Sequence, residues 1–418
     1  MSKSRERVLQ ALNHQNSDCI PVDFGSTAVT GIHCRIVEAL RAYYGLEPKP
    51  VKIVDTFQML GEVDEELAEL IGVDCVGIGG AKDIFNLDVT RLHEQITPWG
   101  QRVLVPQNMD LSPDREGDVY VYAGGDKQYP PSAVMPKGCY FINAIERQQP
   151  IEEDKLCPED NVEEFTLLTD EDLIHYKKMV DEASLSGKAL VASFGGTALG
   201  DVAFVPGMGL KKPKGIRSVV EWYMSTAMRQ DYLHQVFEKE IDIAIANYEK
   251  LWSTLGDKID VVNTCGTDFG SQESQFCSID TFRELWLPYY RRMNDWIHQH
   301  TTWKIFKHSC GAIIPILPGL IEAGFDIINP VQVNAKDMDS HRLKEEFGKQ
   351  LTFWGGGIDT QKVLPFGTPD EVRRHVIQQC EILGRDGGFV FNTVHNIQAN
   401  VPVENVVAMF DALKSLRS

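Results

Sequence analysis

Short apolar runs alternate with amphipathic segments through this chain, and that alternation constrains its fold more than any other feature. Eight runs of five to seven residues have the near-continuous apolar character of strands buried on both faces. They span 19–24, 73–79, 189–195, 259–265, 303–308, 325–331, 351–355 and 388–394. The clearest helical patterns span 231–255, 280–300, 312–323, 340–347, 368–384 and 403–416. Eight strands alternating with helices predict an α/β fold, a (β/α)8 TIM barrel.

The ends of the helical segments carry signals of their own. Thr368 and Glu371 form a capping box, with Pro369 at the first helical position. Helix carboxyl ends are expected at three glycines, Gly324, Gly348 and Gly384. A doubly wound open sheet is the main rival of the barrel. No G-x-G-x-x-G follows the first strand, so the dinucleotide-binding form of that rival has no support.

The connection between the second and third strands is unusually long and covers residues 81–188. Three segments within it, 99–105, 118–125 and 139–143, are typical of antiparallel strands. Long loops on a barrel often form lids or substrate walls. We therefore predict a single barrel domain over 1–418, with 81–188 forming a β-rich inserted lid or wall.

The chain contains 60 Asp and Glu against 41 Lys and Arg, so its formal net charge is −19. Nucleic acids and anionic membranes are disfavoured as partners, because there is no basic stripe to meet phosphates. No apolar run reaches the roughly 18 residues that a membrane span needs. The nine cysteines are scattered and include no C-x-x-C, which indicates free thiols in a reducing compartment. These features predict a cytoplasmic protein that acts on a small molecule.

Side chains that can bind a metal follow the fifth strand. His308 and Cys310 leave its carboxyl end two residues apart, and chemistry in barrels collects at the carboxyl ends of the strands. Zinc favours imidazole and thiolate and needs three or four ligands around one point. His395, after the eighth strand, and Cys265, at the end of the fourth, are candidates for the third ligand. A buried structural thiol or a hydrogen-bonded histidine is the ordinary alternative for each.

Two carboxylates are candidates for an acid–base role. Asp268 and Asp359 each follow a strand within a glycine-rich segment. A helix N-cap or a turn former is the structural alternative for both. Amide side chains near the strand ends are candidate substrate-binding groups, and these are Asn263, Asn329, Gln332, Gln361 and Asn392.

The order and spacing of several motifs resemble the uroporphyrinogen decarboxylase superfamily, which includes zinc-dependent methyltransferases that use methylated corrinoids. The motifs are Gly266-Thr-Asp-Phe-Gly-Ser-Gln272, Phe282-Arg-Glu-Leu-Trp-Leu-Pro-Tyr-Tyr290, His308-Ser-Cys-Gly311, Gly357-Ile-Asp359 and Asn392-Thr-Val-His-Asn-Ile397. The likeness covers most of the chain and is clearest from about 259 to 416. It implies a barrel with its site at the mouth, and a homodimer.

The branches of that superfamily differ in the site. Decarboxylases also carry a histidine at the position of His395, but an arginine-rich segment after their first strand holds the substrate's propionates. The matching stretch here, 21–31, has no arginine. Methyltransferases carry an H-x-C, matched by His308 and Cys310, and a downstream cysteine where this chain presents His395. This departure leaves the third zinc ligand open between His395 and Cys265; with His395 the site has two nitrogens, one sulfur and one open position.

The preferred interpretation is therefore a zinc-dependent methyltransferase. It moves a methyl group between a small methoxylated substrate or a thiol and a corrinoid. A partner protein carries the corrinoid, because no segment of this chain is assigned to corrinoid binding. The alternative is a metal-free decarboxylase or other lyase acting on a small carboxylated substrate, with Asp359 or Asp268 as proton donor and His395 as substrate anchor. A barrel that binds a ligand without turning it over is a third class. Metal content separates the first class from the others.

Overall fold

The computed structural model describes residues 3–195 and 197–417. Its centre is a parallel seven-stranded sheet in the order β15-β14-β13-β12-β11-β10-β4. The strands are β4 (Cys75–Ile78), β10 (Ala189–Ala192), β11 (Val261–Cys265), β12 (Lys304–His308), β13 (Ile327–Asn329), β14 (Thr352–Trp354) and β15 (Phe389–Val390). Each of them lies inside one of the predicted apolar runs.

The first predicted run closes this sheet into a barrel. Val22 forms a parallel bridge with Phe391, directly after β15. The Asp23 N–H donates to Phe391 O at 2.9 Å, and the Phe391 N–H donates to Pro21 O at 2.8 Å. On the opposite side the Asp74 N–H donates to Val22 O at 2.7 Å, just before β4. This segment takes the eighth strand position, and the predicted (β/α)8 barrel is confirmed.

The interior of the barrel is a separate apolar core. Helix α1 (Lys3–Leu12) contributes three side chains to it, and every strand of the seven-stranded sheet contributes at least one. Its members are Val8, Ala11, Leu12, Cys75, Ala189, Val191, Val261, Phe306, Ile327, Trp354 and Val390. Neighbouring strand residues belong instead to the larger core under the helices. Because side chains alternate along a strand, residues two positions further on also face the barrel interior.

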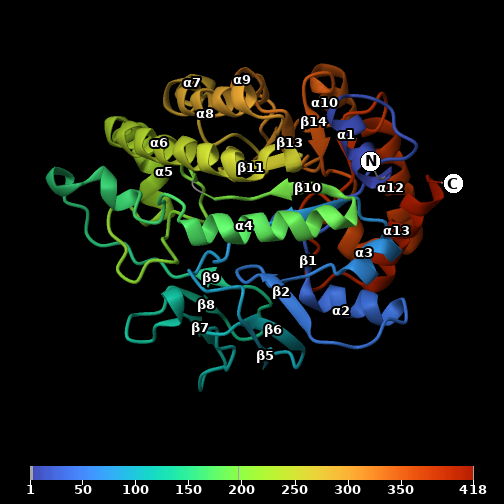
Figure 1. Ribbon diagram of the computed structural model, residues 1–418, viewed down its shortest axis with the longest axis horizontal. Helices are drawn as coiled ribbons and strands as arrows, with labels where there is room; N and C mark the ends of the chain where they lie inside the picture. The colour runs from blue at the N-terminus through green and yellow to red at the C-terminus, as the bar shows by residue number, and fades with distance from the viewer. Residues whose placement is uncertain (1–2, 196, 418) are drawn as a thin grey trace.

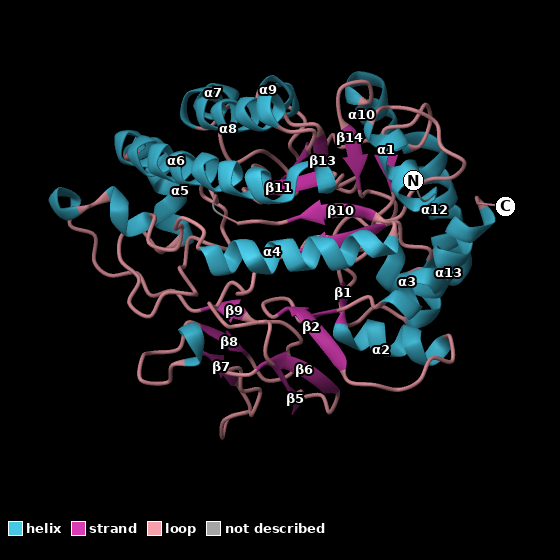
Figure 2. Ribbon diagram, in the orientation of Figure 1, coloured by secondary structure: helices cyan, strands magenta, loops and turns pink. Residues whose placement is uncertain are grey.

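Helices surround the strands, as Figures 1 and 2 show. They are α2 (Cys34–Tyr43), α3 (Glu65–Ile71), α4 (Asp170–Ala183), α5 (Val219–Met228), α6 (Gln230–Leu255), α7 (Ile279–Leu285), α8 (Leu287–His300), α9 (Leu317–Glu322), α10 (Ser340–Phe347), α11 (Val363–Phe366), α12 (Pro369–Leu383) and α13 (Val403–Ser415). The capping box at Thr368 and Glu371 is present at the start of α12. Both termini lie on the same side of the molecule in Figure 1.

Two of the predicted helices are shorter than expected. The segment 280–300 is divided into α7 and α8 at Trp286, and Pro288 lies in the first turn of α8. The predicted helix at 312–323 begins only at Leu317, again with a proline, Pro318, in its first turn. Proline has no N–H to donate, so it is tolerated in a first turn and breaks a longer helix.

The insertion between β4 and β10 is β-rich, as predicted. It contains β5 (Leu92–Ile96), β6 (Arg102–Pro106), β7 (Val119–Val121), β8 (Ala133–Met135) and β9 (Asn143–Ala144). Three further strands precede β4 and were not predicted, namely β1 (Ile32–His33), β2 (Val51–Asp55) and β3 (Leu60–Gly61). Strand β2 pairs with β6, so the five-stranded sheet β1-β3-β2-β6-β5 joins the insertion to the first part of the chain.

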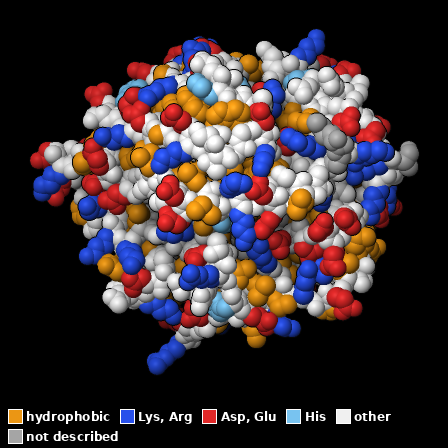
Figure 3. All heavy atoms as spheres, viewed as in Figure 1, with side chains coloured by type: hydrophobic (Ala, Val, Ile, Leu, Met, Phe, Trp, Pro, Cys, Tyr) orange, Lys and Arg blue, Asp and Glu red, His pale blue; other side chains and the backbone are white. Residues whose placement is uncertain are grey.

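The surface carries both signs of charge. On the face shown in Figure 3, Lys and Arg side chains are interspersed with Asp and Glu. Within the described parts of the chain, no helix has both the length and the apolar character that crossing a bilayer demands. All nine cysteines lie within those parts, and all nine are free thiols.

Candidate metal centre

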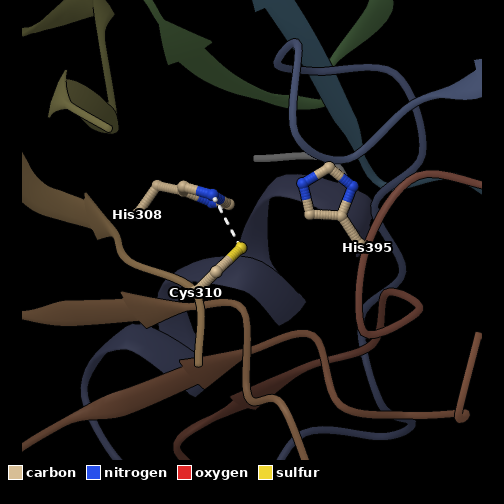
Figure 4. Close-up of side chains that lie close together, drawn as sticks. All are labelled: His308, Cys310 and His395. Carbon is tan, nitrogen blue, oxygen red and sulfur yellow. Dashed lines mark hydrogen bonds between the residues drawn. The ribbon is translucent and has the colours of Figure 1, made fainter. Parts of the chain in front are cut away.

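Three side chains from opposite sides of the barrel mouth converge at the carboxyl ends of the strands. His308 is the last residue of β12, Cys310 lies in the loop that follows it, and His395 lies in the loop after β15. One ligand atom from each residue lies within 4.8 Å of the other two. Figure 4 shows His308 and Cys310 side by side with the His395 ring facing them. The described residues contain no other such group of three or more His, Cys, Asp or Glu side chains.

A chain of hydrogen bonds fixes the orientation of His308. The Asn329 Nδ2–H donates to Trp354 O at 2.8 Å, which leaves Oδ1 as the acceptor that faces His308. His308 Nδ1 lies 2.6 Å from this Oδ1, so the Nδ1–H donates to it. The lone pair is then on Nε2, which accepts from the Cys310 thiol at 3.4 Å. This tautomer presents a metal-binding nitrogen to the centre of the group.

The spacing of this pair suits zinc. With Zn–N near about 2.0 Å and Zn–S near about 2.3 Å, tetrahedral geometry places a nitrogen and a sulfur ligand about 3.5 Å apart. The observed separation of His308 Nε2 and Cys310 Sγ is 3.4 Å. His395 lies slightly further out, since the three ligand atoms span up to 4.8 Å. The two imidazole rings meet edge to face with their centroids 5.6 Å apart.

Burial keeps both imidazoles neutral. It lowers the pKa of His308 to about 4, against a smaller opposing effect of the hydrogen bond with Asn329. It likewise lowers the pKa of His395 to about 4, and the neighbouring His308 adds to that shift. Neutral imidazole is the form that binds metals. Burial raises the pKa of the Cys310 thiol, whereas a bound divalent cation stabilises the thiolate through its charge.

Asp268 lies beside this group and contacts it directly. Its Oδ1 accepts the Cys310 N–H at 2.6 Å and lies 3.8 Å from His308 Nε2. Burial raises the pKa of Asp268, while the hydrogen bond from Cys310 opposes that shift. The buried Lys307 lies behind the site, and its Nζ donates to Thr267 O at 2.8 Å and to His308 O at 2.7 Å. Lys307 thereby ties the strand that carries His308 to the loop that carries Asp268.

A second carboxylate, Asp201, lies close to the site and was missed from the sequence. A Cβ at Gly266 would stand 2.5 Å from Asp201 Oδ2 and 3.9 Å from His308 Cδ2, so only glycine lets this carboxylate approach the strand end. Burial raises the pKa of Asp201 to about 6, and the charge of Asp268 adds to the shift. Asp201 lies in an irregular loop after β10 that has no periodic pattern. The only feature of the sequence related to its position is Gly266, and a single glycine does not indicate which side chain lies beside it.

Cys265 is not part of the ligand group. Strand β11 has a register shift between Asn263 and Cys265, so that Asn263 pairs with Phe306 but Cys265 pairs with Lys307. Paired residues of parallel strands share a face, and Phe306 faces the barrel interior whereas Lys307 faces the helices. The Cys265 thiol accordingly contacts the Tyr290 hydroxyl of α8 at 3.6 Å. The bulge turns this sulfur away from the mouth.

Asp359 stabilises a turn, which is the structural role expected from the sequence as the alternative to acid–base chemistry. Its Oδ1 accepts the N–H of Gln361 at 2.7 Å and that of Lys362 at 3.1 Å, and it also accepts from Asn334 Nδ2 at 3.0 Å. These bonds occupy the carboxylate with the loop after β14. Gln361 itself is exposed. Neither residue forms a hydrogen bond with His308, Cys310 or His395.

The remaining predicted residues lie nearer to the barrel axis. Asn329 orients His308, and Gln332 Oε1 accepts the Gly311 N–H at 2.7 Å in the loop that carries Cys310. Asn263 and Asn392 each keep a buried Oδ1 without a hydrogen-bond partner. Of the five predicted amides, Asn329 contacts a candidate ligand directly and Gln332 contacts the loop that carries Cys310.

The carboxyl-terminal part of the chain, residues 214–416, matches the family model described as Uroporphyrinogen decarboxylase (URO-D). This segment, 203 of the 418 residues, is therefore similar to that family. The matched segment contains all three ligand candidates, His308, Cys310 and His395, so they belong to the part of the chain that the family shares. The sequence matches no curated protein.

One solved structure has the same fold over nearly the whole chain. A methyltransferase from Methanosarcina mazei is 16% identical, with 99% of each chain covered and a TM-score of 0.55. At this identity the likeness shows the fold and no activity. The GH53 catalytic domain of Ignisphaera aggregans (13% identical, 94% and 96% covered) has a TM-score of only 0.33. The β-glucosidase of Pyrococcus furiosus (12% identical, 84% and 85% covered) has a TM-score of 0.37, and neither glycosidase supports a functional argument.

Proposed function

We propose that this chain is a zinc-dependent methyltransferase of the uroporphyrinogen decarboxylase superfamily. It moves a methyl group between a small substrate and a corrinoid that a partner protein carries. The observation behind the proposal is the convergence of His308, Cys310 and His395 at the barrel mouth. Three protein ligands leave a fourth position of a tetrahedral zinc ion free for a substrate atom, which is the arrangement of catalytic zinc.

Zinc at these residues would supply Lewis-acid chemistry to the atom that loses or gains the methyl group. Two neutral imidazoles and one thiolate leave the ion with a net charge of about +1, so it attracts an anionic oxygen or sulfur. A single thiolate donates less electron density than two, which favours an oxygen over a thiolate in the open position. A methoxylated compound therefore suits the site better than a thiol.

The chain's own residues prepare the transfer. Asn329 holds His308 in the tautomer that presents Nε2, and Lys307 holds the two mouth segments together. Demethylation breaks the C–O bond with both electrons staying on oxygen, and the pair for the new bond to the methyl carbon comes from the partner's reduced corrinoid. The substrate oxygen then takes up one proton. Asp268 is the proposed proton donor, because its carboxyl lies beside the ligand group.

The insertion is proposed to act as a wall of the site within one barrel domain. Its strands pack into the same core as the outer faces of the barrel strands, as Val103 and Val119 on one side and Val262 on the other illustrate. A corrinoid protein is the proposed partner, and a homodimer the proposed assembly. Asp359 and Gln361 keep only a proposed role at the rim of the mouth, since the contacts of Asp359 are those of a turn.

Metal analysis of the purified chain tests the proposal. We expect about one zinc per chain, the content of a single catalytic site, and its loss in Cys310→Ser with the fold unchanged. Cys265→Ser is the matched control, because it removes a buried thiol that faces Tyr290 instead of the ligand group. Protein that folds normally without binding zinc would instead support the lyase or the ligand-binding barrel.

Methyl transfer is measured with methoxylated aromatic compounds and reduced corrinoid in solution. The expected products are the free hydroxyl compound and the methylated corrinoid in equal amounts. Both should disappear in Cys310→Ser and persist in Cys265→Ser. Zinc binding without any methyl transfer to corrinoid would contradict the proposed activity while leaving the metal centre in place.

A further inference from the structure

A layer of polar side chains lies inside the barrel directly above its apolar core. The apolar layer includes Val191, Phe306 and Val390. The residues two positions further along these three strands are Ser193, His308 and Asn392, and the same step on β11 and β13 reaches Asn263 and Asn329. Asp23 belongs to the layer as well, since its Oδ2 accepts from the inward-facing Trp354 Nε1 at 2.9 Å. We call these six residues the polar ring.

Half of the polar ring is fully hydrogen-bonded within the protein. Asn329 uses both ends of its amide, toward Trp354 O and His308 Nδ1. Asp23 accepts from the Ser26 hydroxyl at 2.6 Å and from Trp354 Nε1. His308 keeps only Nε2 for the ligand group. These contacts need nothing further from a bound molecule.

The other three members each keep a buried polar atom without a partner, namely Ser193 Oγ, Asn263 Oδ1 and Asn392 Oδ1. Asn392 is fully buried, and its Nδ2 donates to Asp23 O at 2.7 Å and to Thr30 O at 3.3 Å. These two bonds identify Oδ1 as the amide oxygen, a buried acceptor without a partner. An unsatisfied buried polar atom costs about 1–3 kcal/mol, so the two amide oxygens in this layer indicate a molecule that donates hydrogen bonds to them, while the Ser193 hydroxyl can donate or accept.

The charge of the layer restricts what that molecule can be. Among the described residues, no Lys or Arg side chain hydrogen-bonds to a side chain of the polar ring, and Lys307 points its Nζ to two backbone carbonyls instead. The ring already contains the buried carboxyl of Asp23. Within the ring itself, a carboxylate or phosphate on the ligand would face the amide oxygens of Asn263 and Asn392 without a Lys or Arg partner, which is unfavourable in a buried site; only the proposed metal above the ring would attract an anion.

We propose that the polar ring binds a hydroxyl or N–H group of a small uncharged substrate, below the His308–Cys310–His395 group. This inference rests on the proposed function, in which the methyl-bearing atom of the same substrate faces the metal. The fully buried apolar layer underneath, with Phe306 and Trp354, closes the barrel interior below the ring. The substrate class is then an uncharged methoxylated compound that carries a hydrogen-bond donor.

Three matched probes test the inference by calorimetric titration of the zinc-loaded full-length chain. They are 2-methoxyphenol, which carries a donor, 1,2-dimethoxybenzene, which has none, and 2-methoxybenzoate, which carries a negative charge. We expect 2-methoxyphenol to bind about tenfold more tightly than either of the others, the effect of one satisfied hydrogen bond. Equal binding of all three, or tightest binding of the carboxylate, overturns the inference.

Two variants test whether the polar ring causes the tighter binding of 2-methoxyphenol. Ser193→Ala and Asn263→Leu each remove an atom that has no partner in the protein, so the fold should be as stable as in the parent. Each should lower the affinity for 2-methoxyphenol about tenfold and leave that for 1,2-dimethoxybenzene unchanged. Tyr248→Phe is the matched control, because it removes an unpartnered buried hydroxyl on α6, outside the barrel interior, and should change neither affinity.

Ordered water is the competing occupant of the ring. If these atoms only bind water, the variants leave the discrimination between the probes unchanged, and the inference fails. The titration contains no corrinoid, so it is independent of methyl transfer. Selective binding of 2-methoxyphenol without transfer contradicts the proposed function alone, whereas transfer without selectivity contradicts this inference alone.

Discussion

The proposed metal centre depends on residues that are not themselves candidate ligands. His308 can present Nε2 to a cation only if Nδ1 carries the proton, and Asn329 enforces this because its own Nδ2 is held by Trp354 O. If the amide were flipped, its oxygen would face Trp354 O and its NH2 group would face the Nδ1–H of His308, so both hydrogen bonds would be lost. Partners of this kind orient metal ligands, and their loss typically weakens metal affinity 10–100-fold.

Asn329→Ala should therefore weaken zinc binding about 10–100-fold. Asn294→Ala is the matched control, because this buried amide on α8 also donates through Nδ2 to a backbone carbonyl, Ala323 O, but has no contact with His308. Competition with a chromophoric chelator measures both affinities. Equal zinc affinity in the two variants would show that Asn329 does not orient the ligand.

Some residues of the candidate site could be predicted from the sequence and others could not, for physical reasons. His308 and Cys310 were recognisable because they directly follow an apolar strand, and His395 follows another at the same end of the barrel. Cys265, the weaker candidate, also lies at a strand end, but a bulge of one residue reverses its face, and a bulge leaves no periodic trace in the sequence. Asp201 was invisible because its loop has no pattern that places it beside the barrel mouth.

At the scale of single elements, the loop after β10 is held by a buried carboxyl group on a helix. Glu240 of α6 accepts the Ala198 N–H at 3.0 Å and the Leu199 N–H at 2.8 Å with the same oxygen, Oε2. This loop then leads to Asp201 beside the metal centre. Burial raises the pKa of Glu240 to about 7 from an ordinary value of 4.5.

That shift has a defined effect on stability. The folded protein retains the Glu240 proton in a range of pH where the unfolded chain has lost it, so the stabilisation is complete below 4.5 and is lost as the pH rises through about 7. Between pH 5 and 8, the unfolding free energy of the parent should fall by about 3 kcal/mol more than that of Glu240→Gln. Denaturant unfolding at both pH values measures this, with the exposed Glu238→Gln of the same helix as control. Parallel pH profiles for the parent and Glu240→Gln would contradict the assignment.

Elements were easier to predict than their boundaries. The strands of the barrel are continuous apolar runs because helices cover one face and the barrel core fills the other, and this pattern is plain in the sequence. Strands β1 and β3 have only two residues each, too few for any alternation to appear. The helix breaks at Pro288 and Pro318 were readable in principle, since proline favours a first turn.

At the scale of the whole molecule, the insertion and the barrel share one core. Val103 of β6 and Val51 of β2 pair across the small sheet, and both belong to the cluster that includes Val262 and Phe353 of the barrel strands. Apolar contacts that cross between two parts of a chain make them unfold together. The insertion should therefore stabilise the mouth as a fixed wall and should not melt as a unit of its own.

Hydrogen exchange at increasing denaturant tests this cooperativity. Amides of β6 and of β13 should lose protection with the same midpoint, although they lie in different sheets. Val103→Ala, in the fully buried centre of β6, should lower the stability measured at both strands by about 2 kcal/mol. Ile96→Ala, at a side chain 63% exposed on the neighbouring β5, should change neither. A loss of protection confined to β6 in Val103→Ala would show that the insertion is an independent folding unit, and a fixed wall beside the metal centre would then be excluded.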